Sequence, residues 1–102
     1  MKFKTRLEVI ERDDRICQIC GRYTFAAPHH IIHGLGRKLD ELYNLITLCN
    51  EYDKSCHWKV HFSNVPGEAE KYKQMCIQWS RERYGDKIIR LAKEKGRRGD
   101  IG

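Results

Sequence analysis

The sequence predicts an α+β fold held together by a four-cysteine zinc site, and three observations support this prediction. Apolar residues recur at helical spacing near both ends of the 102-residue chain. Two short segments between these regions are rich in β-branched residues, which is typical of strands. Four of the five cysteines lie in two pairs within the first 56 residues, a pattern typical of tetrahedral zinc.

The first element expected is a short amphipathic helix over residues 3–12. It carries Phe3, Leu7 and Ile10 at helical spacing among charged residues, and two aspartates follow it. The next segment is a Cys-x2-Cys turn that ends in Gly21. Glycine permits the positive φ that a knuckle around a metal ion requires.

A β-hairpin and a helix are expected next. Residues 24–32 and 45–48 are predicted to be its strands, with a flexible basic loop at 34–38 between them. Residues 54–62 are predicted to form a helix.

Two further helices are expected in the C-terminal part. Apolar residues recur every three or four positions over 68–84, where Pro66-Gly67 marks the start and Gly85 the end. The domain organisation predicted is one domain over 1–102, with a motif core at 12–62, C-terminal helices at 68–95 and a flexible basic tail at 96–102.

The charge balance favours a polyanionic partner. The net charge is +6, and a lysine or arginine that neutralises a phosphate releases counterions. No apolar run is long enough to span a membrane, and the N-terminal residues lack the apolar core of a signal peptide. We therefore expect a cytoplasmic protein with no membrane partner, in which thiols stay reduced and serve as metal ligands rather than disulfides.

The cysteine spacing predicts a structural zinc ion bound by Cys17, Cys20, Cys49 and Cys56. Four thiolates leave no open position for water, so this zinc is not expected to be catalytic. The six-residue gap in the second pair is wider than usual, and the alternative is a pair of buried reduced cysteines. Cys76 lies on an apolar helix face and is interpreted as a core thiol.

Four histidines remain as two pairs, His29 with His30 and His57 with His61. The second pair is four residues apart, so both side chains project from one helix face. Neutral imidazole can bind a divalent metal and can also act as a base near pH 7. A second metal site that hydrolyses phosphodiesters can be built from these side chains.

The order of these motifs resembles the signature of the HNH endonucleases. The matching segments are His29-His30-Ile31-Ile32, Asn44 to Cys49, and Cys56-His57-x3-His61. The stretch 12–62 is similar to the zinc-bearing HNH endonucleases of bacteriophages. That resemblance implies a ββα-metal (His-Me finger) fold, in which a β-hairpin and a helix hold one catalytic metal.

The resemblance also implies a role for each matching residue. His30 corresponds to the general base that activates the attacking water, and His29 to a metal ligand beside it. Asn44 corresponds to the middle letter of the signature, which positions the base and the loop between the strands. His57 corresponds to the final catalytic histidine and metal ligand, and His61 to the extra ligand of His-x3-His members.

Further expectations concern the metal, the products and the setting. The catalytic ion is Mg²⁺, Mn²⁺, Ni²⁺ or Zn²⁺, and imidazole ligands suit the later transition metals better than Mg²⁺. Family precedent implies 5′-phosphate and 3′-hydroxyl ends and a role in phage DNA processing or packaging in the host cytoplasm. One active site cuts one strand, so a monomer favours nicking, whereas a weak dimer or a second encounter permits double-strand cutting.

Contacts with DNA are expected from Arg37, Lys38, Lys54 and Lys59, although solvated surfaces explain the two lysines on the helix equally well. His33 has no family counterpart. It either touches phosphate together with the basic loop or is an exposed loop histidine.

Two other functions fit parts of the sequence. A non-catalytic zinc module that binds DNA or RNA explains the charge and the cysteines, but leaves the histidines and Asn44 without a role. A packaging accessory that contacts a phage terminase is compatible with nuclease activity, and the predicted helix at 68–84 offers the surface for that contact.

Overall fold

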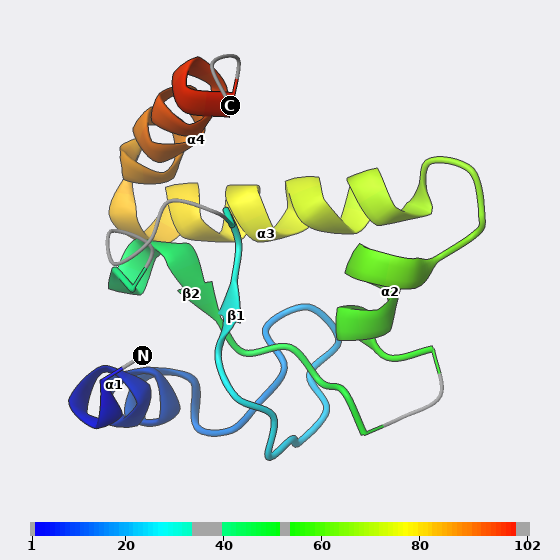
Figure 1. Ribbon diagram of the computed structural model, residues 1–102. Helices are drawn as coiled ribbons and strands as arrows, with labels where there is room; N and C mark the ends of the chain where they lie inside the picture. The colour runs from blue at the N-terminus through cyan, green and yellow to red at the C-terminus, as the bar shows by residue number, and fades with distance from the viewer. Residues whose placement is uncertain (1, 34–39, 52–53, 100–102) are drawn as a thin grey trace.

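The computed structural model describes residues 2–33, 40–51 and 54–99, and in this part of the chain four α-helices flank a two-stranded antiparallel sheet (Figure 1). The α+β class is therefore confirmed. The elements are α1 (Phe3–Asp13), β1 (His29–His30), the 3-10 turn η2 (Leu42–Asn44), β2 (Leu45–Ile46), α2 (Cys56–Phe62), α3 (Glu68–Tyr84) and α4 (Lys87–Gly99).

The sheet is shorter than the sequence indicated. His29 pairs with Ile46 and His30 pairs with Leu45, and the pairing stops there. The predicted strands at 24–32 and 45–48 were therefore too long. The small sheet still brings the histidine pair next to the chain segment that leads to α2 (Figure 1).

The segment before β1 uses its polar groups elsewhere. The Thr24 hydroxyl donates to a Glu51 carboxylate oxygen at 2.7 Å, and the backbone N–H of Phe25 donates to the same oxygen at 2.8 Å. Pro28 has no N–H to donate to a ladder. These interactions replace the β ladder that its residue composition had predicted.

Helix α1 forms as predicted but buries a different face. Phe3 and Leu7 are 75% and 42% exposed, whereas Val9 is fully buried. The apolar stripe predicted for this helix was therefore wrong in two of its three members. The helix ends where Asp14 adopts a left-handed conformation with φ of 54°.

The end of α1 is tied to β2 by side chains. A buried Asp13 oxygen accepts hydrogen bonds from the backbone N–H and the hydroxyl of Thr47, at 3.2 and 2.8 Å. Arg12 donates to the carbonyl of Leu45 at 2.6 Å, and its guanidinium lies 4.6 Å from the centre of the Trp79 ring on α3. These contacts connect the N-terminal helix, the sheet and α3.

The three later helices lie where the sequence predicted them, but α2 begins at Cys56 rather than at Lys54, which adopts a φ of 52°. Ser55 caps α2 by accepting the backbone N–H of Trp58. Helix α3 has the predicted limits, and Gly67 and Gly85 at its ends adopt φ of 79° and 72°, as their lack of a side chain allows. Helix α4 continues to Gly99, so residues 96–99 are helical rather than part of a tail, and 100–102 lie outside the described residues.

The core lies where α3 and α4 cover the hairpin and the cysteine-bearing turns (Figure 1). Ile46 contributes from β2 and Leu48 from the segment after it, and Ile88 and Leu91 contribute from α4. Within the described residues, no helix is both long enough and apolar enough to cross a bilayer.

Candidate functional site

Four cysteines form a compact sulfur cluster, as the sequence predicted. The Sγ atoms of Cys17, Cys20, Cys49 and Cys56 all lie within 4.8 Å of one another. The sulfurs of Cys20 and Cys49 are 3.6 Å apart, and a tetrahedral zinc ion with Zn–S distances near 2.3 Å requires an S–S separation of about 3.8 Å. The cluster can therefore hold a metal ion, and its size is consistent with structural zinc.

Local backbone geometry builds each half of the cluster. Gly21 adopts φ of 80°, and its N–H donates to the carbonyl of Cys17 at 2.9 Å, which closes the first turn. In the second pair, the N–H of Cys56 donates to the Cys49 sulfur at 3.4 Å. The wide gap between Cys49 and Cys56 therefore does not prevent their sulfurs from meeting.

The four thiols differ in their electrostatic environment. Burial raises the pKa of Cys17, but backbone N–H groups of Cys20, Cys49 and Ile19 outweigh it, so the net pKa is lowered. Burial raises the pKa of Cys49 to about 11, and burial with the neighbouring Cys17 charge raises the pKa of Cys56. A bound cation removes this penalty because it neutralises the crowded thiolates.

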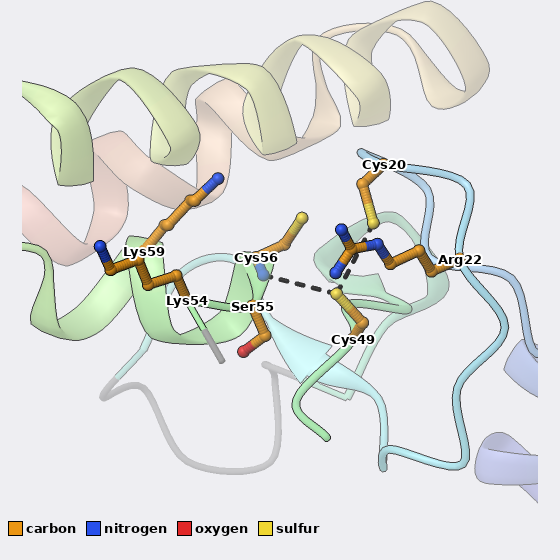
Figure 2. A pocket seen from close by; sticks show the side chains of 7 residues that line it. All are labelled: Cys20, Arg22, Cys49, Lys54, Ser55, Cys56 and Lys59. Atoms are coloured by element: carbon orange, nitrogen blue, oxygen red, sulfur yellow. Dashed lines mark hydrogen bonds between the residues drawn. The ribbon is translucent and has the colours of Figure 1, made fainter. Parts of the chain in front are cut away.

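Basic side chains surround a cavity at the edge of the sulfur cluster (Figure 2). This cavity has a volume of about 230 Å³, and it is lined by Arg22, Lys54 and Lys59 together with Ser55 and three of the cysteines. Lys59 also donates to the Tyr72 hydroxyl on α3 at 3.1 Å. The two lysines predicted to contact DNA thus lie beside the sulfur atoms, and Lys59 is held by a hydrogen bond within the protein.

Three histidines form a second group of potential metal ligands. One ring nitrogen from each of His29, His57 and His61 lies within 4.8 Å of the other two. His29 comes from β1, whereas His57 and His61 project from one face of α2, as their spacing predicted. The rings of His57 and His61 have centroids 4.7 Å apart, and that of His29 is 5.3 and 5.0 Å from them.

The environment of this group favours the neutral form of His29 and His57. Burial, followed by the charges of the neighbouring histidines, lowers the pKa of His29 to about 3. Burial and then His61 also lower the pKa of His57. Neutral imidazoles present lone pairs, so these two side chains are available to a metal cation.

His30 points to a different partner. Its Nε2 is 2.8 Å from a carboxylate oxygen of Asp40, and both side chains are 29% exposed. Asp40 was not among the residues that the sequence indicated, and it lies ten positions from His30, between the two predicted strands. No spacing rule would have selected it, because Asp40 precedes β2 and the contact depends on how this part of the chain lies against β1.

Asn44 is fully buried and forms hydrogen bonds with the backbone just after His29 and His30. Its side-chain oxygen accepts the N–H of Ile32 at 2.8 Å, and its side-chain nitrogen donates to the carbonyl of Ile32 at 3.0 Å. The backbone N–H of Ile31 also donates to the Asn44 carbonyl at 2.9 Å.

Three other predictions have different outcomes. Cys76 is a core thiol as interpreted, since it is 1% exposed and burial raises its pKa to about 12. Arg37 and Lys38 lie outside the described residues. His33, expected either to touch phosphate or to be an exposed loop histidine, is exposed, and its ring centroid lies 5.3 Å from that of His29.

Comparison of the chain with protein-family models, with curated proteins and with solved structures finds no match in any of the three.

Proposed function

We propose that this protein is a metal-dependent DNA endonuclease of the HNH type, in which β1, β2 and α2 form a ββα-metal core. The observation that carries the proposal is the convergence of His29, His57 and His61, whose ligand nitrogens lie within 4.8 Å of one another. The geometry also supports the roles that the resemblance assigns to His30 and Asn44.

The donor atoms of the three-histidine group fit a divalent ion. Three neutral nitrogens favour zinc, nickel or another later transition metal over Mg²⁺, and they leave coordination positions for a phosphate oxygen. When bound there, such an ion supplies positive charge to the phosphate and to the departing 3′ oxygen. The protein groups around it provide the orientation and the proton transfer.

His30 is suited to take the proton of the attacking water. The Asp40 carboxylate can only accept a hydrogen bond, so Nε2 of His30 donates to it and Nδ1 carries the lone pair. Asp40 thereby holds the ring and its tautomer, as a carboxylate does for the histidine of a catalytic triad. Water attacks phosphorus as Nδ1 accepts its proton, the bond between phosphorus and the 3′ oxygen breaks, and solvent supplies the proton that makes the 3′-hydroxyl end.

Asn44 and the sulfur cluster both help to position the histidines of the proposed site. Asn44 fixes the backbone at Ile32, two residues beyond His30, through two hydrogen bonds. Cys56 begins α2 and directly precedes His57, so a zinc ion on the cysteines would fix the end of the helix that carries two of the proposed ligands. The zinc therefore has a positioning role in the proposal, and no part in the chemistry.

A plasmid-cleavage assay tests the proposal. Wild-type protein is expected to convert supercoiled plasmid to nicked circle in the presence of Mg²⁺, Mn²⁺, Ni²⁺ or Zn²⁺. His30→Ala is expected to slow cleavage by about 10²- to 10⁴-fold, because that is the usual contribution of a general base. Its zinc content and circular dichroism spectrum should equal those of the wild type.

The matched control is Gln74→Ala, an exposed and uncharged position on α3 whose amide contacts Glu70. This variant should cut at the wild-type rate. If the wild-type protein binds plasmid in a gel-shift assay but leaves it uncut with all four metals, the nuclease proposal is wrong. The non-catalytic zinc module would then be the better description.

A further inference from the structure

Helix α2 carries two aromatic side chains beside its two proposed metal ligands. Trp58 and Phe62 are four positions apart, so they share one face of the helix. They directly follow His57 and His61, so their face is turned by about 100° from the face that carries the ligands. The two faces therefore adjoin along the helix, and the ring centroids of His61 and Phe62 lie 5.8 Å apart.

The other side of α2 faces the rest of the protein. Cys56 belongs to the core and Val60 packs against it. Lys59 donates a hydrogen bond to the hydroxyl of Tyr72 on α3. Trp58 is not among the described side chains that pack on this core. The face formed by the two aromatic residues is therefore the part of α2 that neither the core nor the proposed metal site uses.

This aromatic face is exposed and its position is fixed. Phe62 is 66% exposed, and Trp58 is partly exposed. In the turn after the helix, the Ser63 hydroxyl donates to a Glu68 carboxylate oxygen at 2.8 Å. The backbone N–H of Val65 donates to the Ser63 hydroxyl oxygen at 3.3 Å. Binding to a surface held in this way costs little ordering of the protein.

A DNA strand is the partner that these observations favour. The net charge of +6 favours a polyanion. A strand with one phosphate on the metal ion would place the neighbouring bases next to the adjoining aromatic face. Aromatic side chains stack on bases of any sequence, because every base has a π-face.

We propose that Trp58 and Phe62 form a stacking surface for the nucleobases next to the phosphate bound at the metal. This inference rests on the proposed function, and it names the form of DNA that the site accepts. Bases that are paired and stacked in a duplex hide their faces, so the bound strand is single-stranded or locally opened at the cut.

Fluorescence anisotropy of a labelled oligothymidylate tests the inference. Full-length protein carries His30→Ala so that the strand stays intact, with zinc on the cysteines and one further equivalent of Zn²⁺. Adding Phe62→Ala is expected to raise the dissociation constant for this strand by about 5- to 150-fold, the range for loss of one stacked base. Binding to an abasic strand of the same length, which keeps the phosphates and lacks the bases, should not change.

The matched control is Phe3→Ala in the same background, which removes another exposed phenylalanine, on α1. Its dissociation constants for both strands should equal those of the background protein. Tryptophan emission gives a second measurement. The oligothymidylate should quench it and the abasic strand should not. Quenching should disappear in Trp58→Phe, because the remaining Trp79 is only 5% exposed.

The inference is overturned if Phe62→Ala binds oligothymidylate as tightly as the background protein, or if it loses as much affinity for the abasic strand. It is also overturned if Phe62→Ala changes only the self-association of the chain in sedimentation, since the face would then be a contact between two copies.

Plasmid cleavage by protein that retains His30 separates this failure from that of the nuclease proposal. Cleavage together with strand binding that does not depend on Phe62 removes the stacking surface and leaves the nuclease intact. Binding that depends on the bases and on Phe62, without cleavage, retains the stacking surface and rejects the nuclease.

Discussion

At the residue scale, His29 is the most buried of the five histidines. It is 6% exposed, and its ring meets those of His33, His57 and His61. Burial, followed by these neighbours, lowers the pKa of His29 to about 3. The neutral imidazole of His29 therefore has a lone pair available for a metal ion.

This pKa has a consequence for stability in protein whose histidines carry no metal. The folded-state pKa of about 3 lies below the ordinary value of 6.5. Between these two pH values His29 therefore binds a proton in the unfolded chain and stays neutral in the folded chain. Stability is therefore unaffected above pH 6.5 and falls as the pH drops below it, by up to about 1.4 kcal/mol per pH unit.

Urea unfolding at pH 6.5 and pH 5 checks this prediction, with zinc left on the cysteines. His29→Gln provides the comparison, because acid protonation of the thiolates affects both proteins equally. The wild type should lose about 1–2 kcal/mol more than His29→Gln between these pH values. Equal losses in the two proteins would show that His29 titrates normally in the folded state.

At the element scale, the hairpin depends on side chains rather than on its ladder. Among the described residues only His29–His30 and Leu45–Ile46 pair as strands, and so short a sheet is marginal by itself. Asn44, at the end of the 3-10 turn, bridges to Ile32, and Asp13 at the end of α1 binds Thr47. The Asn44 contacts hold the two sides of the hairpin together, and the Asp13 contact connects its second side to α1.

Asn44→Ala is therefore expected to lower the free energy of unfolding by about 2–4 kcal/mol, because it leaves the N–H and carbonyl of Ile32 without their side-chain partner. Chemical denaturation measures the change. The matched control Asn50→Ala alters an exposed asparagine and should stay within about 0.5 kcal/mol of the wild type. Equal midpoints for the two variants would mean that the hairpin does not rely on Asn44.

At the scale of the whole molecule, the sulfur cluster is part of the core. Cys17, Cys49 and Cys56 belong to the same buried cluster as residues from β2, α3 and α4. The cluster thus joins the knuckle after α1 to the start of α2. A zinc ion on these sulfurs would link segments that are far apart in the sequence and would stabilise the small domain as a whole.

Removal of that zinc is expected to unfold the protein, since structural zinc contributes about 10–16 kcal/mol in zinc-finger peptides and a small domain has a far smaller margin. In protein whose histidine group carries no metal, a strong thiol-competing chelator should abolish the cooperative thermal transition seen by circular dichroism, with one zinc released per chain. Cys76→Ser, outside the cluster, should keep its zinc. A transition that survives complete zinc loss would contradict this prediction.

The sequence by itself determined the features that depend on neighbouring residues. Helix α3 has its predicted limits because Pro66-Gly67 and Gly85 act locally, and His57 and His61 share a face because they are four apart on a helix. The two cysteine pairs were also identified by spacing, although only the fold could bring their sulfurs together.

Only the tertiary structure decided the contacts made between distant segments. It placed His33 against His29 and His61. It paired His30 with Asp40, and it placed Lys54 and Lys59 at the edge of the sulfur cluster. It also shortened β1, because Glu51 captures the polar groups of the preceding segment. Such contacts depend on how loops fold back across the core, and residue spacing carries no information about that path.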